Sequence, residues 1–178
     1  MESKKLSLVI EPDIRLHQVS SKVEEITPGL SAIFDEMAEI MSEYDGIGLA
    51  GVQVGIQKQI IIIDAGTIAM ETRQKAPAER YLKIINPEII SVSEEKCFIE
   101  EGCLSLPSIF YDVERPSSIS IRYTNEKGEK KELSADGLLA RCIEHEIDHL
   151  NGKVFTDYVG SLKRTLAIKK LKKIKSGK

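Results

Sequence analysis

Two of the chain's three histidines lie in one short segment, CIEHEIDHLNG, at residues 142–152. On a helix, His145 and His149 lie on the same face because they are four residues apart. Two imidazoles one turn apart can bind a common divalent ion. Glu146 projects about 100° away from His145 around the helix axis, so it can reach a water molecule on that ion without binding the ion itself. This HExxH pattern predicts a helix that carries part of a metal site.

The residues around the pattern favour a helix over about 137–150. Asp136 is a typical N-cap residue, and Asn151-Gly152 is a typical helix end. Leu138 and Cys142 fall on the same face as the two histidines. The alternative is a pair of histidines hydrogen-bonded in an apolar core. A chance HExxH match is expected in roughly one chain of this size in several hundred, which disfavours that alternative.

Two histidines do not complete a metal site, because a catalytic zinc-type centre needs three protein ligands and one open position. No histidine follows His149, and Asp157 is the one acidic candidate downstream. We expect His17 to be a surface or packing residue. Cys103, in EGCLSLP at 101–107, is a better third ligand because a thiolate binds zinc or ferrous iron strongly. Taken alone, a cysteine in such an apolar segment would more often be a core residue.

The rest of the chain predicts short strands and separated helices. Pro28 can open a helix that Tyr44-Asp45-Gly46 ends, and the Gly-rich segment 46–57 predicts a tight loop. We expect a surface loop over 65–80. Hydrophobic spacing predicts the remaining elements, which are strands over 58–65, 81–93, 118–125 and 130–136, a hairpin turn over 125–128 and a last helix over 162–174. This order favours an α+β fold with mainly antiparallel strands around the HExxH helix.

Composition limits the compartment and the partners. The chain has 178 residues, of which 42% are apolar and 30% charged, as in ordinary globular proteins. No run approaches the roughly 18 apolar residues of a membrane span, and the N-terminus lacks the character of a signal or transit segment. Three cysteines without disulfide spacing are typical of a reducing compartment. We therefore expect a cytoplasmic protein without a membrane partner.

The net charge of −3 is unevenly distributed. Residues 163–178 contain eight Lys or Arg and no acid, which leaves 17 bases against 28 acids in residues 1–162. An acidic body with a basic tail argues against specific DNA binding. It permits contact between the tail and an anionic partner.

Three segments of the chain resemble, in order and approximate spacing, the three motifs of the peptide deformylases. They are GIGLAGVQ at 46–53, EGCLS at 101–105 and HEIDH at 145–149. The resemblance extends from about Val9 to Tyr158 and implies a single metallohydrolase domain over residues 1–178, with a basic helix or tail over about 162–178. It implies the cytoplasmic removal of formate from the N-formyl-methionyl end of newly made polypeptides. It also implies that the basic helix contacts the ribosome, and the alternative is a solvated terminal helix that packs on the body of the protein.

The resemblance also implies a role for individual residues. Cys103, His145 and His149 would bind Fe²⁺, which Zn²⁺, Ni²⁺ or Co²⁺ could replace. Metal-bound water would attack the formyl group, with Glu146 as general base and acid. The side chain of Gln53 and the backbone N–H of Leu104 would stabilise the oxyanion. The expected substrate-binding residues are Gly46, Ile47, Gly48, Gly102, Leu138, Arg141 and Cys142.

Family likeness also places a structural ion pair between Glu101 and Arg115, near the mouth of the site. Two positions depart from the usual motifs. Gly51 stands where alanine is typical, and we expect it to loosen the loop that holds Gln53. Glu144 stands where glutamine commonly precedes HExxH. Two alternatives remain open: an HExxH endopeptidase, which would need a third ligand downstream of His149, and a catalytically idle metal-binding homologue.

Overall fold

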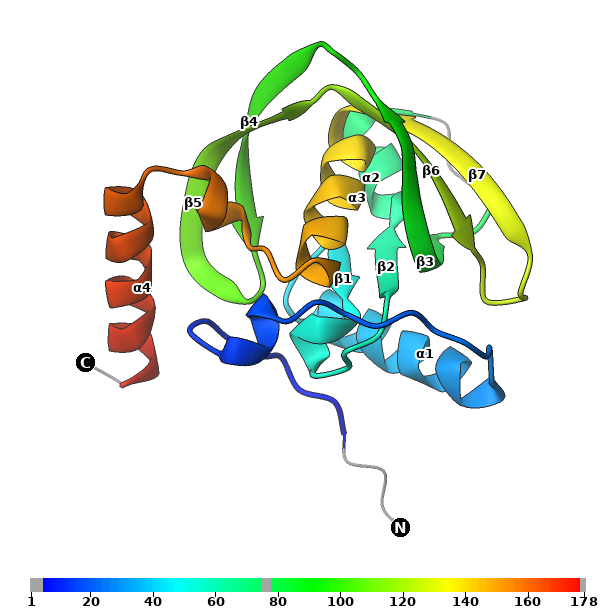
Figure 1. Ribbon diagram of the computed structural model, residues 1–178, viewed down its shortest axis with the longest axis horizontal. Coiled ribbons are helices and arrows are strands. Elements are labelled where there is room, and N and C mark those ends of the chain that lie inside the picture. The colour runs from blue at the N-terminus through cyan, green and yellow to red at the C-terminus, as the bar shows by residue number, and fades with distance from the viewer. Residues whose placement is uncertain (1–4, 75–77, 177–178) are drawn as a thin grey trace.

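The HEIDH helix, α3 (Gly137–Leu150), stands between two antiparallel sheets in the computed structural model, which describes residues 5–74 and 78–176 (Figure 1). One sheet has five strands in the order β1-β2-β3-β6-β7, and the other is the β4–β5 hairpin. This arrangement confirms the α+β class with mainly antiparallel strands. The bounds of the strands are Gly48–Ala50 (β1), Ile60–Asp64 (β2), Tyr81–Val92 (β3), Lys96–Cys103 (β4), Leu106–Pro116 (β5), Ser118–Thr124 (β6) and Lys130–Asp136 (β7).

Two longer helices accompany α3. Helix α1 (Pro28–Glu43) opens at Pro28 as expected, and α4 (Ser161–Lys175) follows α3 after the short 3-10 turn η3 (Phe155–Tyr158). Figure 1 shows α4 at one side of the molecule, next to β5. Within the described ranges, no helix is long and apolar enough to cross a membrane.

The isoleucine run of β2 explains how the core is divided. All four side chains from Ile60 to Ile63 are fully buried. Side chains alternate along a strand, so Ile61 and Ile63 pack in one cluster with α3, whereas Ile60 and Ile62 pack in a second cluster with α1. A strand covered on both faces has this continuous apolar sequence rather than an alternating one. The run therefore fixes α3 and α1 on opposite faces of the large sheet.

A third apolar cluster supports the other side of the site. It joins β5, η3 and α4 through Leu106, Ile109, Val113, Val154, Phe155, Ala167 and Leu171. Cys103 packs against this cluster at the end of β4. The C-terminal helix is therefore docked on the body through Ala167 and Leu171, while its lysines face outward.

Two local predictions need correction. The expected loop over 65–80 begins with helix α2 (Ala65–Thr72). The Asp64 side chain caps this helix by accepting a hydrogen bond from the Thr67 N–H (2.9 Å). Residues 75–77 of the expected loop and residues 177–178 of the expected tail lie outside the described residues. The Gly-rich segment contains β1 and the 3-10 turn η2 (Gly51–Val54) rather than only a loop. The expected N-cap of α3 is confirmed at Asp136, although its side chain makes no capping hydrogen bond.

Gly51 is buried in close contact with its surroundings. A Cβ built on it would lie 2.7 Å from Ile60 Cγ1 and 2.9 Å from the carbonyl oxygen of Ile56. Replacing Gly51 by alanine is therefore expected to lower the free energy of unfolding by about 1–3 kcal/mol through overpacking, although alanine is typical of the family at this position. Urea unfolding would measure this loss. Gly160→Ala, where an added Cβ meets nothing within 4 Å, is the control; equal stabilities of the two variants would contradict the prediction.

Candidate metal centre and active-site cavity

Cys103, His145 and His149 converge although they come from distant parts of the chain. Each offers one ligand atom, and these three atoms lie within 4.8 Å of one another. Cys103 Sγ is 3.2 Å from His149 Nε2. The end of β4 supplies the sulfur, and one face of α3 supplies both imidazoles. One thiolate and two imidazoles are a donor set that suits zinc or ferrous iron.

The contacts of the two rings leave Nε2 of His145 free and place Nε2 of His149 beside Cys103 Sγ. His145 Nδ1 is 3.0 Å from Glu101 Oε2, so Nε2 is the nitrogen left to bind a metal. Buried His149 has no hydrogen-bond partner for Nδ1 within the described residues. Burial lowers the pKa of His149 well below its usual value, which keeps its imidazole neutral, as a metal ligand must be. The residues present therefore fit a divalent ion.

Glu101 holds His145 in place and is itself held by two arginines. Arg115 donates to both carboxylate oxygens, from Nε at 2.6 Å and from Nη2 at 3.0 Å, and Arg141 Nη1 donates to Oε1 at 2.8 Å. Burial would raise the pKa of Glu101, but hydrogen bonds from His145 and Arg115 outweigh it and lower the pKa to about 2. The expected Glu101–Arg115 pair is present, and it lies inside the protein beside a candidate ligand rather than at the mouth.

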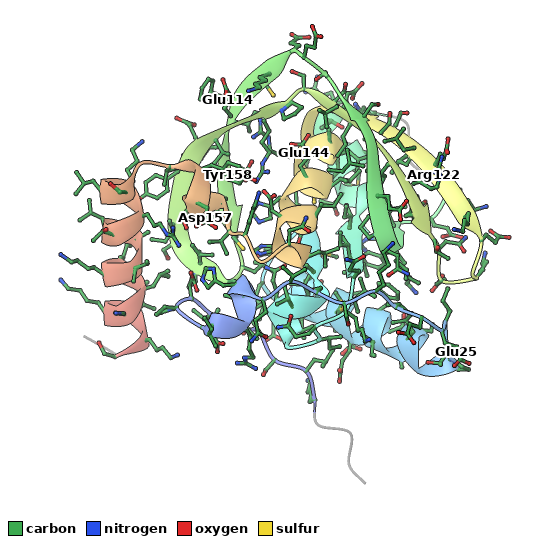
Figure 2. The ribbon with its side chains drawn as sticks, viewed as in Figure 1. Glu25, Glu114, Arg122, Glu144, Asp157 and Tyr158 are labelled. Atoms are coloured by element: carbon green, nitrogen blue, oxygen red, sulfur yellow. The ribbon has the colours of Figure 1, made fainter. Side chains whose placement is uncertain are left out.

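Glu146 and Glu144 lie in different surroundings on α3. The Glu146 carboxylate lines the same cavity as Cys103 and His145. Glu144, labelled in Figure 2, is buried but does not line that cavity. Burial raises the pKa of each carboxyl group to about 7. The unusual Glu144 is therefore a buried acid next to the site and not a solvent-exposed one.

Gln53 is fixed with its amide nitrogen toward Cys103. Its Oε1 accepts a hydrogen bond from the Ala50 N–H (2.8 Å), which leaves Nε2 as the outward donor. That nitrogen is 3.4 Å from Cys103 Sγ and 3.2 Å from Ser105 Oγ. Leu104 follows Cys103 at the cavity wall. Gln53 is almost fully buried, so it is a preorganised donor and not a surface residue.

A cavity of about 510 Å³ contains the predicted substrate-binding residues. Gly46, Ile47 and Gly48 line one wall and Gly102 another, and Leu138, Arg141 and Cys142 belong to α3. The guanidinium of Arg141 is committed to Glu101 and to the carbonyl oxygens of Val113 and Cys97. Arg141 therefore adds little free charge to the cavity.

Comparison with known proteins gives a direct result. The family model described as polypeptide deformylase matches residues 5–165. A peptide deformylase of Bartonella tribocorum is 46% identical over 167 residues, which cover 94% of this chain and 91% of that protein. The chain belongs to the polypeptide deformylase family.

Solved deformylase structures share the fold. The peptide deformylase of Ehrlichia chaffeensis superposes with a TM-score of 0.89 at 39% identity, and the match covers 98% of each chain. A second structure from that organism, in complex with actinonin, gives a TM-score of 0.88 at 41% identity and covers 97% of this chain and 98% of the other. This chain is an enzyme of the deformylase family, and the endopeptidase and the idle homologue are disfavoured.

Sequence reasoning missed several residues of the deformylase site. Ser105 is fully buried and accepts a hydrogen bond from Gln53, and Asp148 accepts one from Arg115. Both residues were visible in the EGCLS and HEIDH motifs, but their type alone assigns them no role. Tyr44, Asp45, Glu100, Pro107, Ser108 and Phe110 complete the lining of the cavity. Phe110 gave no signal, because the β4–β5 pairing that brings it opposite Gly102 was not predicted.

Gly48 gives this deformylase the space for its carboxylate. A Cβ at this position would lie 2.6 Å from Glu146 Oε1 and 2.6 Å from Cys142 Sγ. Replacing Gly48 by alanine is expected to displace the carboxylate and to lower kcat/KM by about 10²-fold, as misplacement by an ångström does in other enzymes. Steady-state kinetics would test this, with Gly160→Ala as the control. A Gly48→Ala enzyme with wild-type kcat/KM would contradict it.

Proposed function

We propose that this deformylase removes the N-formyl group from the formyl-methionyl end of newly made polypeptides in the cytoplasm. Cys103, His145 and His149 would hold one divalent ion. The observation that carries the proposal is that Cys103 and His145 line one cavity with Glu146, while His149 offers a ligand atom within 4.8 Å of theirs. When bound, the ion would supply Lewis acidity, which brings water to a pKa near 7 and polarises a carbonyl group.

Glu146 would carry the proton. Its Oε2 is buried and has no hydrogen-bond partner among the described residues, and a carboxylate next to Gly48 can reach atoms in the cavity. It would accept a proton from the attacking water and return it to the leaving amine nitrogen. One group can perform both transfers because the proton that it accepts from the water is the proton that it returns to the amine.

Two donors would stabilise the charge on the formyl oxygen. Gln53 Nε2 already points toward Cys103, and the backbone N–H of Leu104 follows directly after that sulfur. Neither group titrates near neutral pH, so both remain donors throughout the reaction. One preorganised donor of this kind is worth about 3 kcal/mol of the barrier.

The peptide would bind along the edge of the large sheet. Strand β1 is one edge strand of this sheet. Gly48 of β1 lines the cavity together with Gly46 and Ile47, which precede it. An extended chain can pair with such an edge, and Gly46 and Gly48 permit a close approach. Leu138 and Cys142 would then form an apolar part of the cavity wall against the methionine side chain. Burial raises the pKa of Cys142 well above its usual value, so its thiol stays neutral and apolar in character.

Fe²⁺ is the ion that we propose, with Zn²⁺, Ni²⁺ and Co²⁺ as substitutes. The thiolate of Cys103 suits these ions better than it suits Mg²⁺ or Ca²⁺, which prefer oxygen ligands. Anaerobic purification followed by elemental analysis identifies the ion. The same sample is then assayed for formate release.

The test of the function uses three substrates at equal concentration. A formyl-Met-Ala-Ser peptide is expected to release formate, whereas its acetylated counterpart should react far more slowly. A longer unformylated peptide should not be cleaved internally. Internal cleavage would favour an endopeptidase, and metal binding without any turnover would favour an idle homologue; either result would overturn the proposal.

We also propose that α4 contacts ribosomal RNA. Its lysines face outward while Ala167 and Leu171 dock the helix on the body. Binding to RNA through such a face releases counterions, so affinity for ribosomes is expected to fall by 10-fold or more between about 50 and 200 mM salt. Cosedimentation with ribosomes at salt concentrations over that range measures the affinity. Binding that does not depend on salt, or no binding, would contradict the contact.

A further inference from the structure

We infer that Tyr158 is a positioning residue for His145. It acts through three side chains that join it to the imidazole: Asp148, Arg115 and Glu101. This inference rests on the proposed metal site, since its effect would be to fix the orientation of one ligand. Tyr158 does not line the active-site cavity, so it cannot act by touching the substrate.

The connection is continuous, and each step is a hydrogen bond. The Tyr158 hydroxyl donates to Asp148 Oδ1 at 2.9 Å, and Arg115 Nη1 donates to Asp148 Oδ2 at 2.6 Å. The same guanidinium holds both oxygens of Glu101, and Glu101 Oε2 is 3.0 Å from His145 Nδ1. Five side chains from α3, η3, β4 and β5 therefore form one network.

The inner part of the network is closed to water, and its outer end is open. Glu101 and Arg115 are 5% and 4% exposed, whereas Tyr158 is 47% exposed. The Tyr158 ring also covers the Arg115 guanidinium, whose central carbon is 4.9 Å from the ring centroid. Tyr158 thus contacts the outer part of the network in two ways, by its hydroxyl on Asp148 and by its ring on Arg115. Buried charges of this kind hold a fixed geometry only when all their hydrogen bonds are made.

The turn that carries Tyr158 also touches His145 directly. Phe155, three residues earlier in η3, stacks on the His145 ring with centroids 6.0 Å apart. In Figure 2, Tyr158 is labelled on the segment between α3 and α4. The turn η3 therefore contacts the imidazole of His145 directly through Phe155 and indirectly through the hydrogen bonds that begin at Tyr158.

The test compares Tyr158→Phe with Tyr111→Phe. Tyr111 lies on β5, and its hydroxyl donates to the carbonyl oxygen of Lys163 (3.2 Å), outside the network. Zn²⁺ affinity of each metal-free protein is measured by competition with a chromophoric chelator. Partners that hydrogen-bond to a ligand directly affect affinity by about 10–100-fold. Tyr158 acts one layer farther out, so Tyr158→Phe is expected to weaken Zn²⁺ binding about 3–10-fold, and Tyr111→Phe less than about 1.5-fold.

A merely structural role gives a different result. It would lower the melting temperature of metal-free Tyr158→Phe but leave its Zn²⁺ affinity equal to that of Tyr111→Phe, which would overturn the inference. Asp148→Asn, which removes the next charge in the network, should weaken Zn²⁺ binding more than Tyr158→Phe does. KM should stay unchanged in Tyr158→Phe while kcat falls. If the wild-type chain binds no Zn²⁺, the proposed function fails rather than this inference alone.

Discussion

Replacing Glu146 by glutamine is expected to lower kcat by about 10²–10⁴-fold, because an amide of the same shape cannot accept the proton of the attacking water. Metal content should not change, since Glu146 is not one of the three converging ligand residues. KM should change little, because the cavity keeps its shape. Formate release by the metal-loaded variant, with metal content determined on the same sample, measures the effect.

Glu144→Gln is the matched control for that experiment. Glu144 is a second buried carboxylate on α3, two residues away, but it does not line the cavity. Its replacement is expected to change kcat less than about threefold. If Glu146→Gln kept more than a tenth of the wild-type kcat, another group would have to carry the proton.

Replacing Cys103 by alanine is expected to remove metal binding and, with it, activity. The change deletes one of three ligand atoms and leaves two imidazoles on α3. Ligand binding stabilises a folded protein by about 2.7 kcal/mol at a hundredfold excess over Kd. Zn²⁺ should therefore raise the melting temperature of the wild-type chain by several degrees and that of Cys103→Ala hardly at all.

Cys97→Ala is the control for the thiol. Cys97 lies on β4 as well, but its sulfur accepts a hydrogen bond from Arg141 at 3.2 Å and is not among the converging ligand atoms. It should keep both the Zn²⁺-dependent stabilisation and formate release. Metal content is measured by elemental analysis after gel filtration. One ion per chain in Cys103→Ala would contradict the assignment of Cys103 as a metal ligand.

The sequence was most informative where local spacing alone determines geometry. His145 and His149 had to share a face once they lay on a helix, and the isoleucine run of β2 had to be buried on both sides. The candidate third ligand, Cys103, could not be predicted from local spacing. Cys103 lies 42 positions before His145 in the chain. Only the absence of a better ligand and the likeness of three motifs indicated Cys103, because no local pattern encodes a long-range meeting.

The missed features depend on tertiary pairing. Strands β4 and β5 carry mixed polar and apolar residues, and Phe98 and Phe110 remain largely exposed on them. The alternation of polar and apolar residues that predicts a strand was therefore weak in β4 and β5. Helix α2 was missed because its cap, Asp64, also ends a strand. The proposed role of Tyr158 could not be predicted either, since the three side chains that connect it to His145 come from three elements, α3, β5 and β4.

The burial of β2 on both faces has a consequence for how the enzyme can change. Each isoleucine of Ile60–Ile63 belongs to the support of either α3 or α1, so no side chain in the strand can vary freely. A substitution that shifts the β2 backbone and improves its packing against one helix will misplace the other helix. Paired substitutions at Ile61 and Ile62 should therefore be non-additive, and repair of damage on the α1 side should be able to restore catalysis.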